Sequence, residues 1–318
     1  MIDLFSKRRY FFALSIIIVL AGFIGVLVNG VKLDIQFQGG TLMQIFMTED
    51  NYDAEEVGDL LSEAIGKNIS AQKMETYNAE DTSSKIDLLQ LRVSKDDTLT
   101  AEEINKVVDI LKSDFNVEPD AQMQIQSVEP FMGREMLEKG MLAAILASVL
   151  IMLYVWWRFS VMSGLSAAVC ANLALLHDAF VMFAVYVIFG LPLNESFLAA
   201  VLTILGFSIN DTIVIYDRIR ENTRLMKNMP YPQLVNTSVI QTIARSINTT
   251  VTVMICVITL YIFAVINNID SIKDFSFPLL IGLLSGTYST IFIASPLWAV
   301  WQEARLKRRI AAKAAKAN

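Results

Sequence analysis

The chain has 318 residues, of which 54% are apolar and only 18% are charged. Typical globular proteins carry about 25% charged residues, so this composition, with a mean hydropathy of +0.48, excludes an ordinary soluble enzyme and is typical of a membrane protein. The formal net charge of −6 by itself favours neither nucleic acid nor an anionic membrane surface as a partner. Two cysteines make no disulfide framework. Cys170 and Cys256 each lie inside an apolar run, where we expect small buried side chains.

A basic segment, Lys7 to Arg9, precedes an apolar run from Phe11 to about Val28. A cleavable signal peptide begins in the same way. However, about 18 apolar residues can span a bilayer, and no small-residue cleavage motif precedes Asn29. The pattern predicts a retained first transmembrane helix within residues 1–30.

Residues 31–139 have the pattern of a water-exposed domain. Alternating apolar runs predict strands, and two amphipathic runs predict helices. Alternation at 33–37 and again at 42–46 is expected to form the first strand region, with further strands at 70–77, 86–93 and 123–128 and helices at 53–65 and from Thr98 onward. Thr100 and Glu103 have the spacing of a capping box at the start of the second helix. The order β-α-β-β-α-β is that of a ferredoxin-like α+β domain.

Five more apolar runs follow, at 141–157, 160–189, 196–216, 246–266 and 275–301. Trp156, Trp157, Trp298 and Trp301 lie near their ends, as is typical of the membrane interface. We therefore predict a membrane α-helical bundle with six transmembrane helices and one exported ferredoxin-like domain between helices 1 and 2. Residues 140–303 form helices 2–6 in this prediction, and residues 304–318 form a basic tail.

The charge distribution indicates the orientation. Residues 31–139 hold 10 Lys and Arg against 23 Asp and Glu, whereas the rest of the chain holds 16 against 9. The basic clusters precede span 1, follow span 2 at Arg158, separate spans 4 and 5, and follow span 6. The positive-inside rule places all four clusters in the cytoplasm. Both termini are then cytoplasmic, and residues 31–139 are exported.

Ionisable residues inside a bilayer are costly, so each is a functional hypothesis. Span 3 contains His177 and Asp178, span 4 contains Asn210 and Asp211, and span 5 opens with Arg245. Asp211 lies roughly 10 Å inside its end of the span, on the same side as Arg245, so a pair between them is geometrically reasonable. The pair is either a structural ion pair or a switchable proton carrier, in which withdrawal of the arginine favours protonation of the acid.

The other polar positions allow two interpretations. His177 and Asp178 form a second relay or serve helix packing. Adjacent helical residues point about 100° apart, so we do not expect these two side chains to touch. Asp217 and Arg218 at the end of span 4 are expected to form a solvated mouth with local salt bridges.

Several glycines indicate close backbone contacts. Gly39 and Gly40, before Thr41, are typical of a bulge or tight bend. Gly206 suits a close approach of helices, as does the G-x-x-x-G pair of Gly282 and Gly286.

The motifs of common enzymes are missing from the sequence. It contains no P-loop motif, and one histidine with two separated cysteines cannot build a usual transition-metal site. No catalytic triad can be assembled around His177 without placing it in lipid. We therefore expect a protein without enzymatic activity and without a cofactor other than protons as coupling ion.

Three stretches carry a resemblance to a known family. They are residues 33–41 (LDIQFQGGT), His177-Asp178, and residues 206–222, which run from GFSINDTIV into DRIREN. Arg245, followed by Ser246 and two threonines, fits the same pattern. On these motifs the chain resembles the SecF family of protein-export subunits over nearly its whole length. It departs from the family at Glu129, where the family usually has glycine.

The resemblance implies a role in bacterial protein export. The family belongs to the resistance-nodulation-division superfamily of the cytoplasmic (inner) membrane, and it works as a pair with SecD beside the SecYEG channel, with a YajC-type accessory subunit. The resemblance implies that the proton gradient drives or completes translocation of an emerging unfolded preprotein after the ATP-driven step. It implies Asp211 as the proton-carrying acid and Arg245 as its modulator, with Asn210, His177 and Asp178 as weaker candidates.

Three rival functions remain open from the sequence. A half-sized proton-driven exporter of lipids or small molecules would require a large apolar pocket in the exported domain. An intramembrane aspartyl protease would require Asp178 and Asp211 to face each other at similar depth, whereas their positions place Asp178 nearer the outside. A passive scaffold has no need for charges inside the bilayer.

Overall fold

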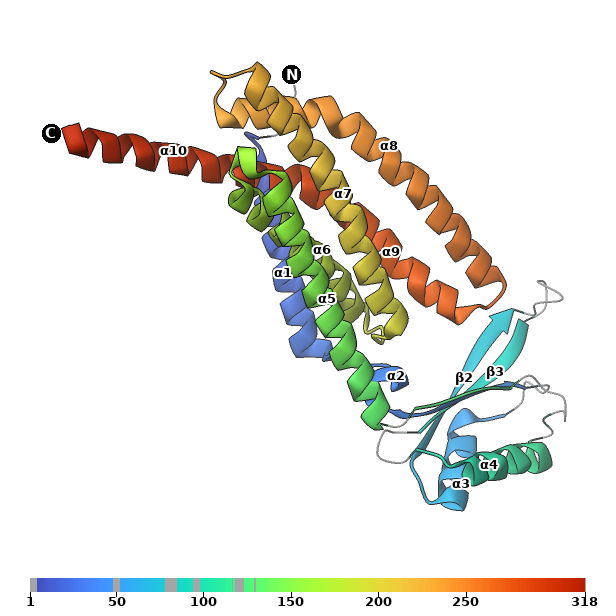
Figure 1. Cartoon of the computed structure of the whole chain (residues 1–318). Helices are drawn as coiled ribbons and strands as arrows, with labels where there is room; N and C mark the ends of the chain where they lie inside the picture. Colours follow the sequence, from blue (N-terminus) through green and yellow to red (C-terminus); the bar gives the residue numbers. More distant parts are fainter. Residues whose placement is uncertain are drawn as a thin grey trace.

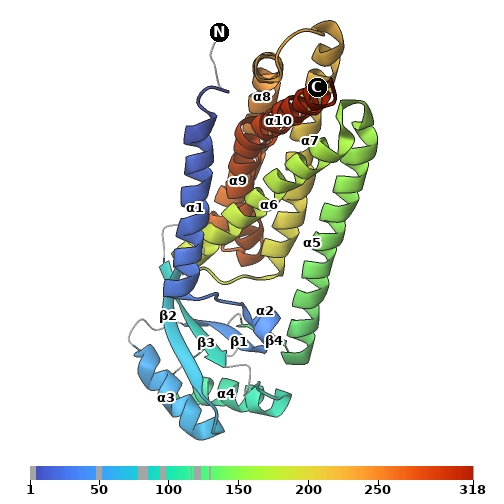
Figure 2. The same ribbon diagram turned by 90° about the vertical axis from the view of Figure 1, so that its left-hand side faces the viewer.

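The computed structural model describes residues 5–47, 52–77, 85–93, 98–115, 117, 123–128 and 130–317. Long helices lie side by side and form a bundle, and a small sheet with two helices lies at one end of it (Figure 1). The described ends of the chain both lie at the opposite end of the bundle. A view turned by 90° shows the same separation of the two parts (Figure 2).

The bundle consists of α1 (Arg8–Asn29), α5 (Pro130–Arg158), α6 (Gly164–Phe189), α7 (Glu195–Leu225), α8 (Tyr231–Ile266) and α9 (Asp270–Ser289). A 3-10 turn (Ser160–Met162) joins α5 to α6, and a π-helical turn (Thr290–Ala294) joins α9 to α10 (Ser295–Ala317). Within the described residues, six helical segments are long and apolar enough to cross a membrane, so the predicted number of spans is confirmed.

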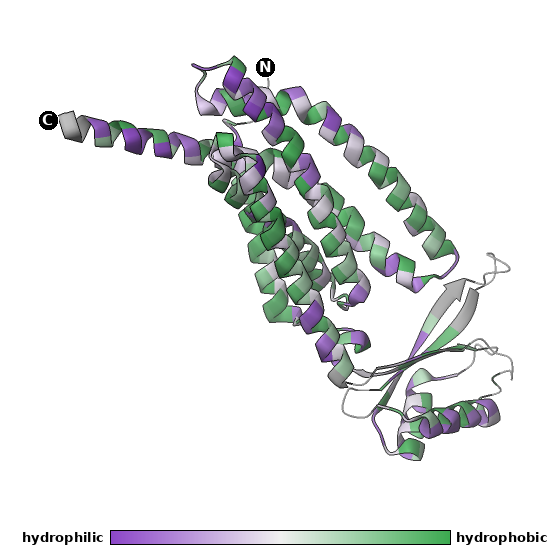
Figure 3. Cartoon of the chain, in the orientation of Figure 1, coloured by the Kyte–Doolittle hydropathy of each residue, from purple (hydrophilic) through white to green (hydrophobic). Residues whose placement is uncertain are grey.

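Helix α10 departs from the direction of the other helices. It leaves the bundle at the end away from the sheet and runs across that end (Figure 1). Hydropathy changes at the same level: the long helices are mostly hydrophobic, whereas α10 and the turn between α7 and α8 are rich in hydrophilic residues (Figure 3). This end of the bundle is therefore where apolar surface gives way to polar surface.

The sheet contains β1 (Gly40–Met47), β2 (Ile69–Tyr77), β3 (Lys85–Val93) and β4 (Met123–Val128) in the order β2-β3-β1-β4. All three strand pairs are antiparallel. Helices α3 (Ala54–Ile65) and α4 (Ala101–Asp114) cover the face of the sheet away from the bundle (Figures 1 and 2). Ile45, Val57, Leu61, Leu89 and Leu111 are fully buried between them. We call these strands with α3 and α4 the sheet module.

The strand expected at residues 33–37 is wrong. Ile35–Gln38 form a single helical turn, α2, and Leu33 instead makes an isolated parallel bridge to Leu193. The carboxylate of Asp34 accepts the backbone N–H of Gln36 at 3.3 Å and caps the turn, a local bond that competes with strand pairing. Gly39 ends the turn at φ +80°, and Gly40 follows at φ +129°. The tight bend expected at the two glycines is confirmed.

Other local predictions have mixed outcomes. The capping box of Thr100 and Glu103 is present at the start of α4. Cys170 is buried as expected, but Cys256 is exposed because it lies on a face of α8 that no other described segment of this chain covers. Glu129, the departure from the resembled family, lies outside the described residues.

Candidate functional site

Asp178 of α6 is fully buried and is held by three serine hydroxyls from two other helices. Ser208 of α7 donates to Oδ2 at 2.7 Å. Ser285 of α9 donates to Oδ1 at 2.7 Å, and Ser289 donates to Oδ2 at 2.8 Å. Both carboxylate oxygens thus accept hydrogen bonds, which compensates for burying the group. We call these four residues the Asp178 cluster; it ties α6 to α7 and α9.

His177 contacts the neighbouring carboxylate, contrary to the prediction. Its Nδ1 lies 3.3 Å from Oδ1 of Asp178. The backbone directions of adjacent residues diverge by about 100°, but the rotatable imidazole and carboxylate ends bridge the difference. The other ring nitrogen, Nε2, is buried without a hydrogen-bond partner among the described residues, and the ring stands beside Tyr288 at 6.0 Å between centroids.

Sequence reasoning missed the contribution of the last span. Ser285 and Ser289, four residues apart on one face of α9, both donate to Asp178. Thr290, in the π-helical turn, shares a hydrogen bond with Thr212 of α7 at 2.9 Å. The signal in the sequence was a run of hydroxyl side chains on one helical face within an apolar span. The π-helical turn lies next to this polar contact, as such turns frequently do at functional sites.

Asp211 of α7 is only partly satisfied. It is 7% exposed, and Oδ1 accepts the hydroxyl of Ser246 of α8 at 2.5 Å. Oδ2 is buried and has no hydrogen-bond partner within the part of the chain that the structure describes. Ser246 in turn belongs to a short polar contact between α8 and α9, because Thr250 bonds both the backbone of Ser246 and the hydroxyl of Thr287.

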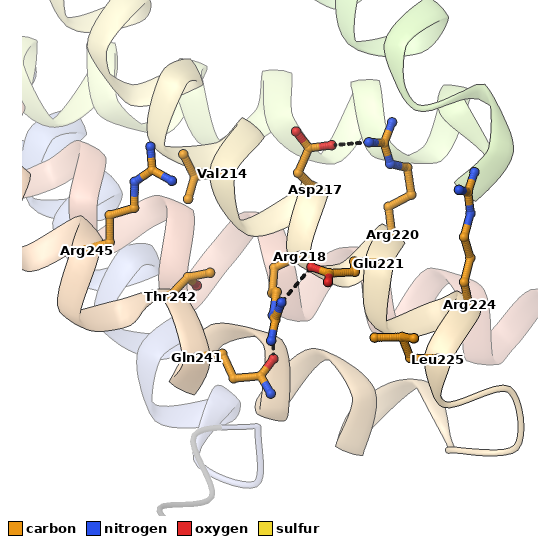
Figure 4. Close-up of a pocket in the computed structure, with 10 residues that line it drawn as sticks. All are labelled: Val214, Asp217, Arg218, Arg220, Glu221, Arg224, Leu225, Gln241, Thr242 and Arg245. Atoms are coloured by element: carbon orange, nitrogen blue, oxygen red, sulfur yellow. Dashed lines mark hydrogen bonds and ion pairs between the residues drawn. The ribbon is translucent and has the colours of Figure 1, made fainter.

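Arg245 directly precedes the serine that binds Asp211. Its side chain is exposed and lines an open cavity of about 710 Å³ between α7 and α8 (Figure 4). In this conformation it is not ion-paired with Asp211 within 4.0 Å. The acid and the arginine therefore lie on neighbouring helices, with Ser246 rather than the guanidinium in contact with the carboxylate.

The mouth of α7 carries the expected salt bridges. Asp217 pairs with Arg158 of α5 at 3.0 Å and with Arg220 at 2.9 Å. Arg218 pairs with Glu221 at 2.6 Å and donates to Gln241 of α8 at 2.7 Å. These contacts join α5, α7 and α8 at the end of the bundle away from the sheet module.

Two motif residues of α7 point away from the rest of the chain. Asn210 and Gly206 are exposed, and no described atom lies within 4 Å of where a Cβ on Gly206 would stand. The close helix approach expected at Gly206 is therefore wrong within this chain. By contrast, a Cβ on Gly282 would lie 2.4 Å from Ile204 of α7, and one on Gly286 would lie 3.1 Å from Ser208. The G-x-x-x-G pair does bring α9 against α7.

Thr41, after the two glycines, serves the sheet module. It is fully buried, shares a hydrogen bond with Ser127 of β4 at 3.1 Å, and accepts the backbone N–H of Leu99 at 3.1 Å. It thus links β1, β4 and the segment that leads into α4.

Comparison with known proteins identifies the family. The family described as "Protein export membrane protein SecD/SecF, C-terminal" matches residues 109–304. The protein translocase subunit SecF of Alicyclobacillus acidocaldarius is 36% identical over 314 residues, which are 96% of this chain and 94% of that one. The chain belongs to the SecF family. This membership supports a role in protein translocation across a membrane.

Longer relatives contain a counterpart of this SecF-family chain as one part. The protein translocase subunit SecDF of Bacillus subtilis is 35% identical over 96% of this chain but only 39% of its own length. The crystal structure of SecDF from Thermus thermophilus, described as a translocon-associated membrane protein, superposes with a TM-score of 0.77 at 27% identity. That match covers 95% of this chain and 39% of the SecDF chain, so the chain spans about two fifths of the SecDF proteins.

Proposed function

We propose that the chain uses the proton gradient to drive or complete preprotein translocation after the ATP-driven step, paired with SecD beside the SecYEG channel. The observation that carries the proposal is the half-satisfied carboxylate of Asp211. One oxygen is held by Ser246, whereas the other is buried without a partner in the described part of the chain. A buried, unpartnered carboxylate oxygen is costly, so this position calls for a second group.

A proton or the guanidinium of Arg245 can supply that group. A proton on Oδ2 removes the buried negative charge, and a guanidinium beside Oδ2 compensates it. Arg245 adjoins Ser246 in sequence and lies in an open cavity with room to move. Movement of Arg245 toward or away from Asp211 then exchanges the two states. The His177–Asp178 pair differs, because the Asp178 carboxylate is already held by three serines, and we assign it a structural role.

A direct path leads from α7 to the sheet module. Asp211 lies 16 residues, roughly 24 Å, from the start of α7. There, Leu193 exchanges backbone hydrogen bonds with Lys32 and Asp34 at 2.9 and 2.8 Å. The backbone N–H of Glu195 donates to the side chain of Gln36 at 3.1 Å. A shift of α7 along its axis therefore moves α2, which leads through Gly39 and Gly40 into β1.

Helix α5 also packs against α2, at Gly133. A Cβ on Gly133 would lie 2.8 Å from the carbonyl oxygen of Gln36 and 2.9 Å from that of Phe37. The backbone of α2 thus packs directly against α5, while the side chain of Gln36 is hydrogen-bonded to the start of α7. We propose that α2 is the connection through which proton-driven motion of the bundle reaches the sheet module. One proton moving through 100 mV supplies about 2.3 kcal/mol.

We also propose that the sheet module is ferredoxin-like and exported, and that a SecD-type partner contacts the bundle. The antiparallel order β2-β3-β1-β4 with α3 and α4 on one face supports a ferredoxin-like sheet module. The basic residues at the opposite end of the bundle support cytoplasmic termini and an exported module in the bacterial inner membrane. The fused SecDF relatives and the exposed Asn210 inside a span support a SecD-type partner covering this face of α7. We also propose that a YajC-type accessory subunit is a partner of the complex and that the chain has no enzymatic activity.

The test compares Asp211→Asn and Arg245→Met with the parent in export of a preprotein into membrane vesicles. We expect both variants to retain ATP-driven export and to lose its stimulation by a proton gradient, because neither can exchange the two states at Oδ2. Asp217→Asn is the matched control, since it removes a carboxylate from the same helix at its solvated end. We expect this control to respond to the gradient like the parent.

Two outcomes would overturn the proposal. If Asp211→Asn and Arg245→Met assemble normally and still respond to the gradient, the chain is a scaffold rather than a coupling subunit. If the control loses the response equally, the effect reflects general damage to α7 and not the chemistry of Asp211.

A further inference from the structure

Strand β2 lies at an edge of the sheet, so one side of it pairs with no described strand. The backbone of Ile69 marks this side. Its N–H donates to the hydroxyl of Ser62 of α3 at 3.0 Å, and the same hydroxyl lies 3.3 Å from its carbonyl oxygen. Ile69 therefore turns both polar groups away from Val93, its partner on β3. This orientation recurs at every second residue of an antiparallel strand, so the N–H and carbonyl groups of Ala71 and Lys73 also point to the outer edge.

An open groove of about 670 Å³ runs along this edge. One wall is the consecutive run of residues 68–73. Neighbouring residues of a strand point to opposite faces, so a groove lined by all of them follows the edge of β2 and not one face of the sheet. The other wall is the first half of α3, with Ala54, Glu55, Gly58 and Asp59. We call this space the β2 groove.

The β2 groove has the arrangement in which an extended peptide is bound by addition to a sheet. Main-chain hydrogen bonds to the exposed edge give such a complex its affinity, and they do not depend on the sequence of the peptide. Ala54, Gly58 and Ala71 line the groove, and these small residues leave the main chain accessible. The end of β2 projects beyond α3 toward the bundle (Figure 1), so α3 does not cover the edge past Lys73.

The charge of the β2 groove favours a basic partner. Glu55 and Asp59 are exposed, and neither carboxylate has a lysine or arginine nitrogen within 4.0 Å among the described residues. Lys73 is the only basic residue among those that line the groove in the described part of the chain, and its ammonium stands over the ring of Tyr52 at 4.8 Å. The surrounding residues 31–139 hold 10 Lys and Arg against 23 Asp and Glu. Lysine and arginine side chains of a bound segment would therefore complement this region.

We propose that the outer edge of β2 binds an extended, basic segment of an unfolded polypeptide as an added strand. The main chain of the segment pairs with Lys73 and the residues that follow it, and its basic side chains lie near Glu55 and Asp59. Only the identification of this polypeptide with an emerging preprotein rests on the proposed function. The binding itself requires neither a proton gradient nor the rest of the export machinery.

The test measures binding of a short fluorescent peptide of alternating lysine and valine to the full-length chain in mild detergent, by fluorescence anisotropy. We expect this peptide to bind, and its counterpart with glutamate in place of lysine to bind much more weakly. A third peptide keeps the lysines and valines but carries a methyl group on every backbone nitrogen. It cannot donate to the edge of β2, so we expect it to bind about tenfold more weakly or worse.

Two pairs of variants locate the site. Lys73→Pro removes an outward N–H at an edge position, where proline spares the pairing with β3, whereas Lys73→Ala keeps that N–H. We expect Lys73→Pro to bind the basic peptide about fivefold more weakly than Lys73→Ala, the effect of one hydrogen bond. Asp59→Asn should weaken binding about two- to fivefold. Its matched control is Asp109→Asn, an exposed acid of α4 outside the groove lining, which should change binding less than about twofold.

Several outcomes would overturn the proposal. Equal binding of the methylated and unmethylated peptides would exclude strand addition, and this comparison does not depend on the folding of any variant. Equal binding by Lys73→Pro and Lys73→Ala would exclude the edge of β2. Equal loss in Asp59→Asn and Asp109→Asn would assign the binding to general surface charge. A chain that dimerises without peptide and loses this dimer in Lys73→Pro would show that a second copy occupies the edge instead.

The proposal and the proposed function can fail separately. The peptide assay contains no gradient and measures no export, so a negative result leaves the predicted effects of Asp211→Asn and Arg245→Met unchanged. Conversely, if those two variants still respond to the gradient, peptide binding at β2 stands and the proton coupling does not.

Discussion

Replacing Ser289 with alanine removes one of the hydroxyls that donate to the buried carboxylate of Asp178. The bond is 2.8 Å long, and both side chains are fully buried. Hydrogen bonds between helices in membrane proteins average about 0.6 kcal/mol, whereas removing a partner from a buried polar group costs about 1–3 kcal/mol. Because Asp178 has no exposed surface through which water could replace the lost donor, we expect Ser289→Ala to destabilise the bundle by about 1–3 kcal/mol.

The assay is unfolding of the full-length chain in detergent, read as Tm and as free energy of unfolding. Ser276→Ala is a close control, since Ser276 is also a fully buried serine of α9. Its hydroxyl bonds only to backbone carbonyls of its own helix, Ile272 at 2.6 Å and Lys273 at 3.4 Å. We expect the control to cost clearly less than Ser289→Ala, because the two backbone carbonyls belong to the helical ladder of α9 and no buried polar side chain loses its partner.

A double-mutant cycle isolates the contact itself. In the Asp178→Asn background, an amide replaces the carboxylate whose two oxygens accept the serine hydroxyls, so Ser289→Ala should cost clearly less than it does in the parent. The reasoning is refuted if Ser289→Ala and Ser276→Ala destabilise equally. It is also refuted if the cost of Ser289→Ala is the same in both backgrounds, because the bond to the carboxylate would then contribute nothing.

Three further predictions concern the sheet module, the helix packing and the connection between the two parts. The hydrogen bond from Lys67, followed by the backbone bond of Thr100, lowers the pKa of Glu103 from 4.5 to about 2. A group with a lowered pKa stabilises the fold at a pH above its ordinary pKa, and this stabilisation is lost as the pH falls toward about 2. The difference in Tm between the parent and Lys67→Met should therefore shrink as the pH falls from 4.5 to about 2. A Tm difference that stays constant over this range would contradict the ion pair. Gly282→Val should lower the Tm, because overpacking a core costs about 1–3 kcal/mol of stability. Even a Cβ at this position would lie 2.4 Å from the side chain of Ile204 of α7. Gly206→Ala, in open space, should not lower the Tm of the isolated chain. Gln36→Ala breaks the side-chain link to α7 and should reduce export stimulated by the proton gradient while leaving the ATP-driven step intact. Unchanged stimulation would exclude this side-chain bond from the connection and leave only the backbone bonds of Leu193 to Lys32 and Asp34.

The transmembrane helices and the sheet module could be predicted because each follows from a local pattern. A run of about 20 apolar residues spans a bilayer wherever it occurs, and six such segments are present among the described residues. Alternation and helical periodicity likewise located the strands and the two helices of the sheet module. The exception at residues 33–37 arose where the alternation of a strand coincided with Asp34, a residue that caps a helical turn. There the local hydrogen bond prevailed over the periodicity.

The candidate site could be predicted only in part, because its partners are distant in sequence. Asp211 and Arg245 stood out from the sequence as ionisable groups in or beside an apolar span, whatever surrounds them. The sequence did not show which of the two acids, Asp178 or Asp211, has hydrogen bonds to both carboxylate oxygens. Ser285 and Ser289 follow Asp178 by more than 100 residues, and serines in an apolar span give little signal of where their hydroxyls donate.

The sequence by itself determined where the chain meets lipid and which charges stand in unfavourable surroundings, since burial in a bilayer depends on composition along short segments. Only the tertiary structure decided the environment of each charge. It placed three hydroxyls on Asp178, left one oxygen of Asp211 without a partner in the described chain, and gathered four arginines around one cavity. The physical reason is that hydrogen bonds and ion pairs act over a few ångströms, so they depend on how the helices pack against one another and not on their order along the chain.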